Sequence, residues 1–338
     1  MVGANSEYAI ERFYLKYFNE EPGVVSELFE AQNIFLTFYK KNFFNKIIFR
    51  IGYKRIYKKI NDLFKIKVIN FKPDIIFVFK GMELMPKTIM WAKAMKIKVV
   101  NYNPDNPFIF SGRGSGNANV TNSISLYDVH LTYNHEILEL IESKYQIPTY
   151  LLPFGYDISV PSFTGICLTT EVIKVCFVGS PDKLRVDFLL KLANKGVSID
   201  VYGSNWDKLI KHKNIDIHKP VYGDVMWDTL RKYRVQLNPL RIHNLNSHAM
   251  RSFEVPGIGG IMLAPRTAEH LKYFSEGEEA FYYDDIEEAS SKLKFILSLV
   301  QKDANKIREA ARKRSLSSGY HYKDRAQFAL TIFNQFEA

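Results

Sequence analysis

Short continuous apolar runs alternate with longer stretches of helical spacing in the first half of the chain. The runs lie at residues 74–79 (DIIFVF), 97–102 (IKVVNY) and 129–133 (VHLTY), and the helical patterns at 7–18, 86–95 and 134–145. Strands that are apolar on both sides, with helices between them, are typical of a parallel sheet covered on both faces. The pattern therefore predicts a doubly wound, Rossmann-like α/β domain over residues 1–158.

The same alternation returns after residue 172. The predicted strands are 172–179, 198–202, 235–237, 261–264 and 280–283, and the predicted helices are 181–194, 224–233, 286–299 and 303–316. This predicts a second Rossmann-like domain over 172–320, with a ligand crevice outside the carboxyl ends of its strands. Residues 159–170 have the composition of a hinge, so we expect two domains that face each other across a cleft. The last segment, 321–338, holds a helix without a following strand and is free to cross back onto the first domain.

The composition of the 338 residues, 46% hydrophobic and 24% charged, is that of an ordered globular protein. Only Cys167 and Cys176 are present, too few for a secreted disulfide framework, and no apolar run is long enough for a transmembrane helix. We therefore expect a cytoplasmic protein, either soluble or peripheral on the inner face of the cell membrane. Residues 1–4 read as the tail of a strand that enters its glycine turn, so the upstream half of this strand is expected to be missing from the sequence.

The formal net charge of +10 is concentrated in residues 40–67, which hold ten basic residues and one acid, Asp62. Phenylalanine, isoleucine and leucine recur at helical spacing in the same stretch, which predicts a basic amphipathic helix or helix pair. Such a face can hold an anionic membrane surface, at about 1 kcal/mol for each basic residue near it. A solvated face over a packed apolar stripe is the alternative. No nucleic-acid-binding motif accompanies the charge, so nucleic acid is not expected as a partner.

Two arginines are placed to complete a phosphate site in the second domain. Gly179 and Ser180 follow a predicted strand and precede a helix, whose free N–H groups attract phosphate oxygens. Arg185 lies about one turn into that helix and can project back toward its start. Arg241 ends the sequence NPLR directly after another strand, at the same carboxyl edge. Each residue also has a plain structural interpretation, as a connecting turn or a surface charge.

The segment 251–265, RSFEVPGIGGIMLAP, predicts a short helix beside a buried strand, with Gly259 and Gly260 allowing the turn between them. Asn246 or Ser247 is expected to cap the start of the helix, and Pro256 and Gly257 to end it. Glu254 then falls near the helix C-terminus, where the dipole does not favour a carboxylate, so we expect it to bind a ligand diol. The alternative is an ion pair with Arg251, three residues away, on the helix face.

In the first domain Asp105, within NPDNP, follows a strand directly and is expected to lie in an exposed turn aimed at the cleft. An ordinary Asx turn is the alternative. His243 and His248 lie five residues apart without companion cysteines or acids, so no metal site is predicted. No set of serine, histidine and acid, and no flanking glutamate pair, is placed for hydrolysis.

The second domain also carries a series of longer motifs in a fixed order. They are FVGSPDKLR, DVYGSNW, VYGDVMWDTLRKYRVQLNPLR, RSFEVPGIGGIML, YFSEGEEAFYYDD and YHYKDRAQ. As a set they resemble the CgeB-like (spore-maturation-protein type) branch of the nucleotide-sugar glycosyltransferases, which have the two-domain GT-B fold. The first domain is similar only in outline, through NPDNP and LLPFGYD, so acceptor chemistry is not carried over.

The resemblance implies a role for several residues of the second domain. Glu254 would bind the donor ribose, and Tyr202, Gly203 and Trp206 would lie toward the base. The groups facing the diphosphate would be Arg185, Arg241, the N–H groups near Gly179 and Ser180, and those at the Ser247 helix start, with Arg251 beside them. Many relatives carry a second glutamate eight positions before the ribose-binding one, where this sequence has Asn246.

These expectations together predict an enzyme, a hexosyl- or related transferase. It would move a sugar from a nucleoside-diphosphate sugar to a glycan, lipid or protein acceptor, without a metal or other cofactor. Arg241 would stabilise the departing diphosphate, and Asp105 would act as base if the reaction inverts configuration. Two alternatives remain open: a noncatalytic protein that binds sugar nucleotides, and a sugar-nucleotide epimerase.

Overall fold

The computed structural model describes residues 1–52, 55–110, 114–157 and 171–336. The chain divides into two compact units, unit 1 (Met1–Pro153 and Tyr322–Ala338) and unit 2 (Phe154–His321). The division falls at Pro153, ahead of the boundary expected at residue 158, because residues 154–157 pack with unit 2. The hinge predicted at residues 159–170, and Cys167 within it, lie outside the described residues.

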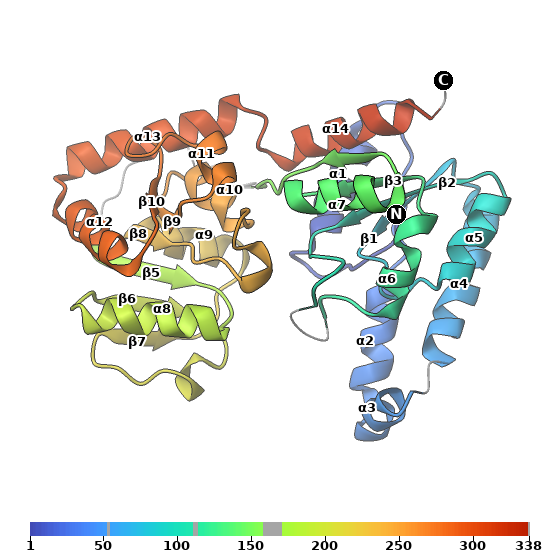
Figure 1. The fold of residues 1–338 in the computed structure, drawn as a ribbon, viewed down its shortest axis with the longest axis horizontal. Helices are drawn as coiled ribbons and strands as arrows, with labels where there is room; N and C mark the ends of the chain where they lie inside the picture. Colours follow the sequence, from blue (N-terminus) through green and yellow to red (C-terminus); the bar gives the residue numbers. More distant parts are fainter. Residues whose placement is uncertain (53–54, 111–113, 158–170, 337–338) are drawn as a thin grey trace. The chain divides into compact units, whose positions relative to one another are not determined.

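Unit 1 is built on a four-stranded parallel sheet in the order β1-β2-β3-β4 (Figure 1). The strands are β1 (Ile75–Phe79), β2 (Lys98–Asn103), β3 (Val129–Thr132) and β4 (Thr149–Leu151). Val2 forms a parallel bridge with Val78 and so extends the sheet beyond β1, in agreement with the strand tail expected at residues 1–4. The sequence did not predict β4, whose three residues are too few to show a pattern.

The helices of unit 1 follow the predicted order, with more breaks than expected in the basic region. They are α1 (Ile10–Glu20), α2 (Ala31–Lys41), α3 (Phe43–Arg50), α4 (Arg55–Phe71), α5 (Pro86–Ala94), α6 (Ala118–Ser123), α7 (His135–Tyr145) and α14 (Tyr322–Asn334). The C-terminal helix α14 packs along α1, where Tyr322 stacks on Phe13 with ring centroids 4.8 Å apart. Among the described residues, no helix is both long and apolar enough to span a membrane.

Unit 2 is built on a six-stranded parallel sheet in the order β10-β9-β8-β5-β6-β7. Its strands are β5 (Val172–Val178), β6 (Ile199–Tyr202), β7 (Ile215–His218), β8 (Tyr233–Leu237), β9 (Met262–Pro265) and β10 (Phe281–Tyr283). Its helices are α8 (Lys183–Asn194), α9 (Gly223–Lys232), α10 (Arg251–Gly257), α11 (Ala268–Tyr273), α12 (Ile286–Ser298) and α13 (Gln301–Ser317). Both sheets thus confirm the predicted pair of Rossmann-like domains.

Both faces of the unit 2 sheet are covered. One apolar cluster joins the strands to α8, α12 and the start of α13, and a second joins them to α9. Alternate residues of β5 serve the two clusters: Val175 and Phe177 point into the first, and Cys176 and Val178 into the second. This explains why the strand reads as a continuous apolar run.

Candidate functional site

The strand order of unit 2 reverses between β5 and β8. From β5 the chain moves outward to β6 and β7 and then returns to β8 on the other side. In an open parallel sheet, the loops that leave two such strands diverge and create a crevice at their carboxyl ends. Gly179 and Ser180 follow β5, and Arg241 follows β8. These residues, which the sequence predicts to bind phosphate, therefore lie at the same switch point.

Two glycines allow the turns after β5 and β6 to approach each other closely. The N–H group of Gly179 donates to the carbonyl oxygen of Tyr202 at 3.0 Å. A Cβ atom at Gly203 would lie only 2.3 Å from the carbonyl oxygen of Gly179, so a larger residue would force the turns apart. Trp206 is fully buried, and its indole nitrogen donates to that same carbonyl oxygen. Trp206 thus supports the turn from within the core and, against expectation, has no exposed ring face to offer a base.

Arg185 spans the crevice. Its backbone N–H donates to the side-chain carboxylate of Asp182, the N-cap residue, which fixes it in the first turn of α8. Its side chain turns back, so that Nε donates to the carbonyl oxygen of Pro239 at 3.0 Å and Nη1 to that of Ser180 at 3.1 Å. The direction predicted for this side chain is confirmed. One buried guanidinium therefore connects the loop after β5 with the loop after β8.

Positive charge is concentrated around Arg185. Burial, followed by the positive charges of Arg241 and Arg251, lowers the pKa of the Arg185 guanidinium to about 10. Asp182 is the neighbouring acid, with its carboxylate 3.6 Å from Nε of Arg185 and 4.0 Å from Nε of Arg241. A partly buried group of cations that disfavour one another is stabilised by a bound anion. We call Arg185, Arg241 and Arg251 the arginine cluster.

Glu254 is buried and paired with Arg251. Its side chain is 7% exposed and forms an ion pair with Nη1 of Arg251, the interaction that the sequence offered as the alternative to ligand binding. The Arg251 side chain is 25% exposed, and its guanidinium lies 6.0 Å from the centre of the Trp227 ring, so the pair is partly buried. Binding of a ribose by Glu254 stays a prediction.

The helix that carries Glu254 ends where the sequence predicts. α10 ends at Gly257, directly after Pro256, as predicted, and Glu254 is the middle residue of this seven-residue helix, three residues before its end. The turn that follows does use a left-handed residue, Gly259, with φ of 70°. Gly260 has a steric reason of its own, because a Cβ atom there would lie 2.7 Å from Oε1 of Gln236.

The expected helix start at Ser247 is wrong. α10 begins at Arg251, and its N-cap residue, Met250, makes no side-chain capping bond. The N–H group of Ser247 instead donates to the carbonyl oxygen of Asn244 in a turn, and its hydroxyl donates to Glu269. The predicted contact of Ser247 with a diphosphate relied on a helix N-terminus at this residue, and α10 does not begin there.

A buried polar group that the sequence did not reveal supports the segment before α10. His248 is fully buried, and its Nδ1 bonds the carboxylate of Glu269. Its Nε2 accepts a hydrogen bond from the N–H group of Phe154 at 3.2 Å, so the ring proton lies on Nδ1. His248 was expected to be a polar loop residue. His248 anchors the segment that leads to Arg251 through its bond to Glu269 of α11. Because α11 is distant in sequence, the local pattern around His248 could not reveal this role.

Tyr202 is partly exposed at the carboxyl end of β6. Its ring stacks on His218 with centroids 4.5 Å apart, and its hydroxyl lies 2.8 Å from that of Tyr233. His218 belongs to β7, a strand that the sequence analysis missed because its polar residues Asp216 and His218 hide the apolar pattern. The stacked pair adds an aromatic surface beside the turn at Gly203.

In unit 1, Asp105 follows β2 and is half-buried, not exposed as expected. Its carboxylate forms an ion pair with Lys80 at 2.5 Å, and its N–H group donates to the side chain of Asn103. A second carboxylate, Glu83, lies in the loop after β1 and is 7% exposed. Burial raises the pKa of Glu83 to about 7, against an opposing effect of Lys80. The only sequence feature that could have indicated Glu83 is a single acid between methionine and leucine, four residues after the end of a strand.

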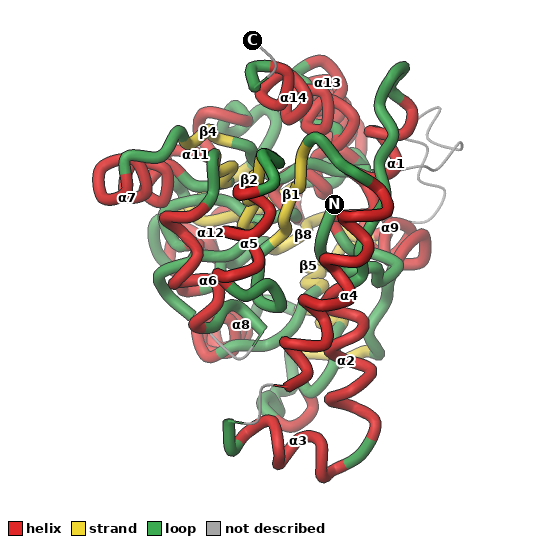
Figure 2. Tube along the Cα trace, turned by 90° about the vertical axis from the view of Figure 1, so that its right-hand side faces the viewer, coloured by secondary structure: helices red, strands yellow, loops and turns green. Residues whose placement is uncertain are grey.

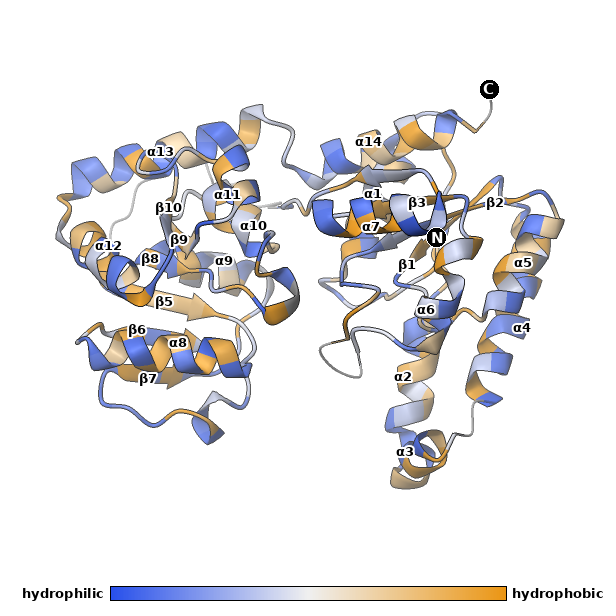
Figure 3. Cartoon of the chain, in the orientation of Figure 1, coloured by the Kyte–Doolittle hydropathy of each residue, from blue (hydrophilic) through white to orange (hydrophobic). Residues whose placement is uncertain are grey.

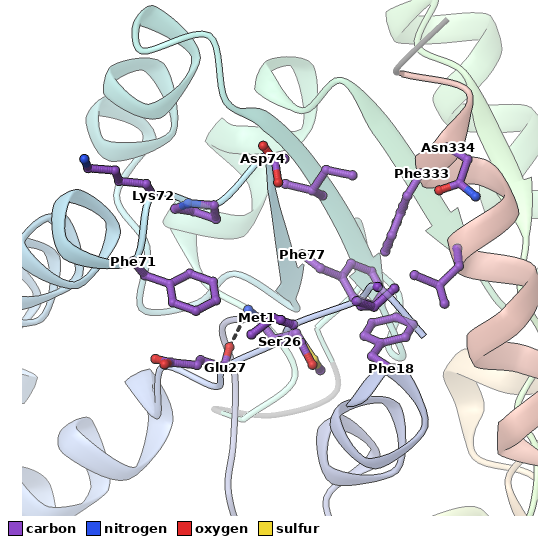
Figure 4. A pocket seen from close by; sticks show the side chains of 16 residues that line it. Met1, Phe18, Ser26, Glu27, Phe71, Lys72, Asp74, Phe77, Phe333 and Asn334 are labelled. Atoms are coloured by element: carbon purple, nitrogen blue, oxygen red, sulfur yellow. Dashed lines mark hydrogen bonds between the residues drawn. The ribbon is translucent and has the colours of Figure 1, made fainter. Parts of the chain in front are cut away.

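A cavity of about 450 Å³ lies elsewhere in unit 1 (Figure 4). It is near the amino end of β1, at Ile75, and Phe18, Phe77 and Phe333 line it. Since Asp105 and Glu83 follow the carboxyl ends of the strands, this cavity is separate from them. Among the described residues, no group of three or more His, Cys, Asp or Glu side chains is arranged to hold a metal ion.

One protein-family model matches the part of the chain that contains the arginine cluster. Residues 185–331 match the glycosyl transferase-like family model. The matched segment begins at Arg185 and includes Arg241, Arg251 and Glu254. No curated protein matches the sequence.

Solved structures resemble all or most of the chain at low sequence identity. A glycosyltransferase from Rickettsia africae is 11% identical, with a TM-score of 0.66, over 99% of this chain and 97% of that one. The UDP-GlcNAc 2-epimerase from Neisseria meningitidis, bound to UDP-GlcNAc, is 13% identical, with a TM-score of 0.57, over 99% and 98%. Sucrose-phosphate synthase from Thermosynechococcus elongatus is 11% identical, with a TM-score of 0.59, over 85% and 79%. These likenesses show the GT-B fold.

Proposed function

We propose that this protein is a glycosyltransferase that moves a sugar from a nucleoside-diphosphate sugar to a glycan, lipid or protein acceptor. The observation that carries the proposal is the arginine cluster at the switch point of unit 2. Guanidinium groups favour phosphate oxygens because their N–H groups can bind two oxygens at once. The glycosyl transferase-like match over residues 185–331 supports the same assignment.

The main chemical task of the arginine cluster is to stabilise the leaving group. As the glycosidic bond lengthens, negative charge develops on the departing diphosphate, and fixed cations lower the energy of that state. Arg185 is suited to this task because two backbone carbonyl groups already hold its guanidinium in place. Arg241 is more exposed and can close onto the phosphates, while Gly179 and Ser180 provide close backbone approach. The predicted independence from metal ions follows from this use of arginine.

Other residues at the carboxyl edge of the unit 2 sheet are assigned to binding of the donor nucleoside. Glu254 accepts hydrogen bonds from the ribose hydroxyls, and the ion pair with Arg251 orients its carboxylate. Tyr202, with His218 stacked on it, provides a ring surface for the base beside Gly203. In this assignment Trp206 and Ser247 act indirectly, through the turns that they support.

The acceptor must lose a proton during transfer. If configuration is retained, the departing phosphate can take this proton. If configuration is inverted, a carboxylate is required. Asp105, which Lys80 orients, and Glu83 are the carboxylates of unit 1 that we propose for that role. The resemblance to the CgeB-like branch and a part in polysaccharide biosynthesis stay predictions.

The experiment is a panel of UDP, GDP and ADP sugars, scored for release of free nucleoside diphosphate with and without candidate acceptors. We expect slow hydrolysis of at least one donor without acceptor, and its loss in Arg241→Ala. Lys183→Ala, an exposed cation in the first turn of the same α8 that carries Arg185, is the matched control and should keep wild-type turnover. Binding of a donor without turnover under all conditions would favour the noncatalytic alternative.

An epimerase is the second candidate, because the Neisseria meningitidis UDP-GlcNAc 2-epimerase matches nearly the full length of both chains. It makes a different prediction in the same panel. An epimerase converts one sugar nucleotide into its epimer without an acceptor, which proton NMR of the sugar ring detects. A transferase leaves the donor sugar unepimerised and joins it to water or acceptor.

A further inference from the structure

The basic region of unit 1 ends in a short helix that no core covers. α3 lies at the far end of α2 and α4 from the sheet, and none of its residues is buried (Figures 1 and 2). Its inner side is nevertheless held in place. Phe49 packs against the rings of Phe35 and Tyr57, and the Asn45 side chain donates to the carbonyl oxygen of Phe38 at 2.7 Å. The end of this projection is therefore a built structural element.

The outer side of α3 is apolar. Phe43 is 68% exposed and Phe44 72% exposed, and Ile47 and Ile51 are exposed on the following turns. The spacing of three and four residues places these side chains on one stripe of the helix. The hydrophobic colour at this tip is visible in Figure 3. A cluster of large exposed apolar side chains over about two turns of helix differs from the scattered single residues of an ordinary surface.

Basic side chains surround this stripe. Exposed Lys40 and Lys41 end α2, and exposed Arg50 ends α3. On α4 the exposed Lys58 and Lys59, with Arg55, line an open groove that also contains Leu63 and Ile66. Asp62 is the sole acid in residues 31–71 of the sequence. The apolar stripe is thus framed by positive charge on both flanking helices.

We propose that α3, with the adjoining ends of α2 and α4, is a docking tip for an anionic lipid bilayer. Phe43, Phe44, Ile47 and Ile51 enter the interfacial layer, and the surrounding lysines and arginines contact the anionic headgroups. A bilayer fits this surface better than an acidic protein does. A convex tip of one short helix buries little area against a second protein, whereas a fluid lipid surface closes around it. The proposal is independent of the donor chemistry of unit 2.

The test is flotation of the full chain with vesicles of phosphatidylcholine alone or of phosphatidylcholine with 30 mol% phosphatidylserine. We expect binding to the anionic vesicles at low salt and release as ionic strength rises. Lys40→Gln with Lys41→Gln should lower the affinity about 30-fold, since each basic residue near the surface contributes about fivefold. Lys302→Gln with Lys313→Gln, two exposed cations of α13, removes the same charge elsewhere and should leave binding unchanged.

A second variant tests insertion separately from charge. Phe44→Ser with Ile51→Ser keeps every cation and is expected to abolish most binding, and both sites are so exposed that folding should persist, which circular dichroism can check. Leu316→Ser, at a residue 63% exposed in unit 2, is the matched apolar control. In Phe44→Trp, brominated lipids should quench the new fluorescence. The proposal is overturned if anionic vesicles do not retain the protein at low salt, or if the serine variant binds them as the wild type does.

Discussion

The indole nitrogen of Trp206 donates a hydrogen bond to the carbonyl oxygen of Gly179 at 2.8 Å, which ties the turn after β6 to the turn after β5. Trp206 is fully buried in the unit 2 core, so the packing of that core is transmitted directly to the edge where Arg185 bonds the carbonyl oxygen of Ser180. The geometry of the arginine cluster therefore depends on how closely these two turns approach.

Gly203→Ala tests this dependence. Its Cβ atom would lie 2.3 Å from the Gly179 carbonyl oxygen, so the two turns must separate. Overpacking of this kind costs typically 1–3 kcal/mol, and we expect lower thermal stability together with weaker nucleoside diphosphate binding. Calorimetric titration and thermal denaturation measure both. Gly114→Ala, where a Cβ atom meets nothing within 4 Å, is the control, and equal losses in the two variants would refute the assignment.

Glu254→Ala separates ligand binding from simple helix pairing. Each hydrogen bond from a ribose hydroxyl to this carboxylate contributes about 1.5–3 kcal/mol, so the loss of even one should lower nucleotide affinity roughly tenfold to more than a hundredfold. Asp303→Ala is matched to it, since Asp303 pairs with Lys306 at the same three-residue spacing on the surface of α13. Unchanged affinity in Glu254→Ala would leave Glu254 as a partner of Arg251 alone.

Glu83 should make the stability of unit 1 depend on pH. Burial raises its pKa from 4.5 to about 7, so between these values the unfolded chain has released the proton while the folded unit retains it. The sign follows: Glu83 lowers stability progressively as pH rises through this window, by roughly 3 kcal/mol in full. Glu83→Gln should therefore gain stability relative to wild type from pH 4.5 to 7, measured by urea denaturation. Parallel pH profiles would contradict this, and Glu7→Gln, at an exposed site in unit 1, is the control.

Glu171 should be essential for the stability of unit 2. Its carboxylate bonds Arg234, at 2.5 Å and 2.6 Å, and Arg308, and both arginine side chains are almost completely buried. Glu171→Ala leaves two buried cations without their acid, which costs about 3–5 kcal/mol. Thermal denaturation should show a large drop in melting temperature, with little change in Asp303→Ala. A melting temperature within a degree of wild type would show that the arginines find other partners.

Local patterns in the sequence were sufficient for the sheets but not for every residue of the site. Strands such as 75–79 and 172–178 are predictable because both faces of a parallel strand are apolar. The direction of the Arg185 side chain was predictable because this residue lies in the first turn of its helix, within reach of the preceding loop. In contrast, an aromatic residue after a strand, such as Trp206, can face a ligand or the core, and only tertiary packing decides between the two.

The errors around α10 have a related cause. Asn246 and Ser247 have the composition of a helix cap, but the buried acid Glu269, which arrives from α11, takes the Ser247 hydroxyl and favours a turn instead. The exposure of Phe43 and Phe44 could not be predicted from hydrophobic periodicity either, since an apolar stripe on a helix has the same spacing whether it faces a core or solvent.

The most direct test of the central claim, that the arginine cluster binds a diphosphate, is calorimetric titration of matched nucleosides and nucleoside diphosphates. Arg241 is the residue to change, because it is partly exposed and its removal should leave the fold intact. We predict that wild type and Lys183→Ala bind a nucleoside diphosphate more tightly than its nucleoside, and that Arg241→Ala loses about ten- to a hundredfold for the diphosphate alone. Equal diphosphate affinity in Arg241→Ala and wild type, or no diphosphate binding at all, would contradict the account.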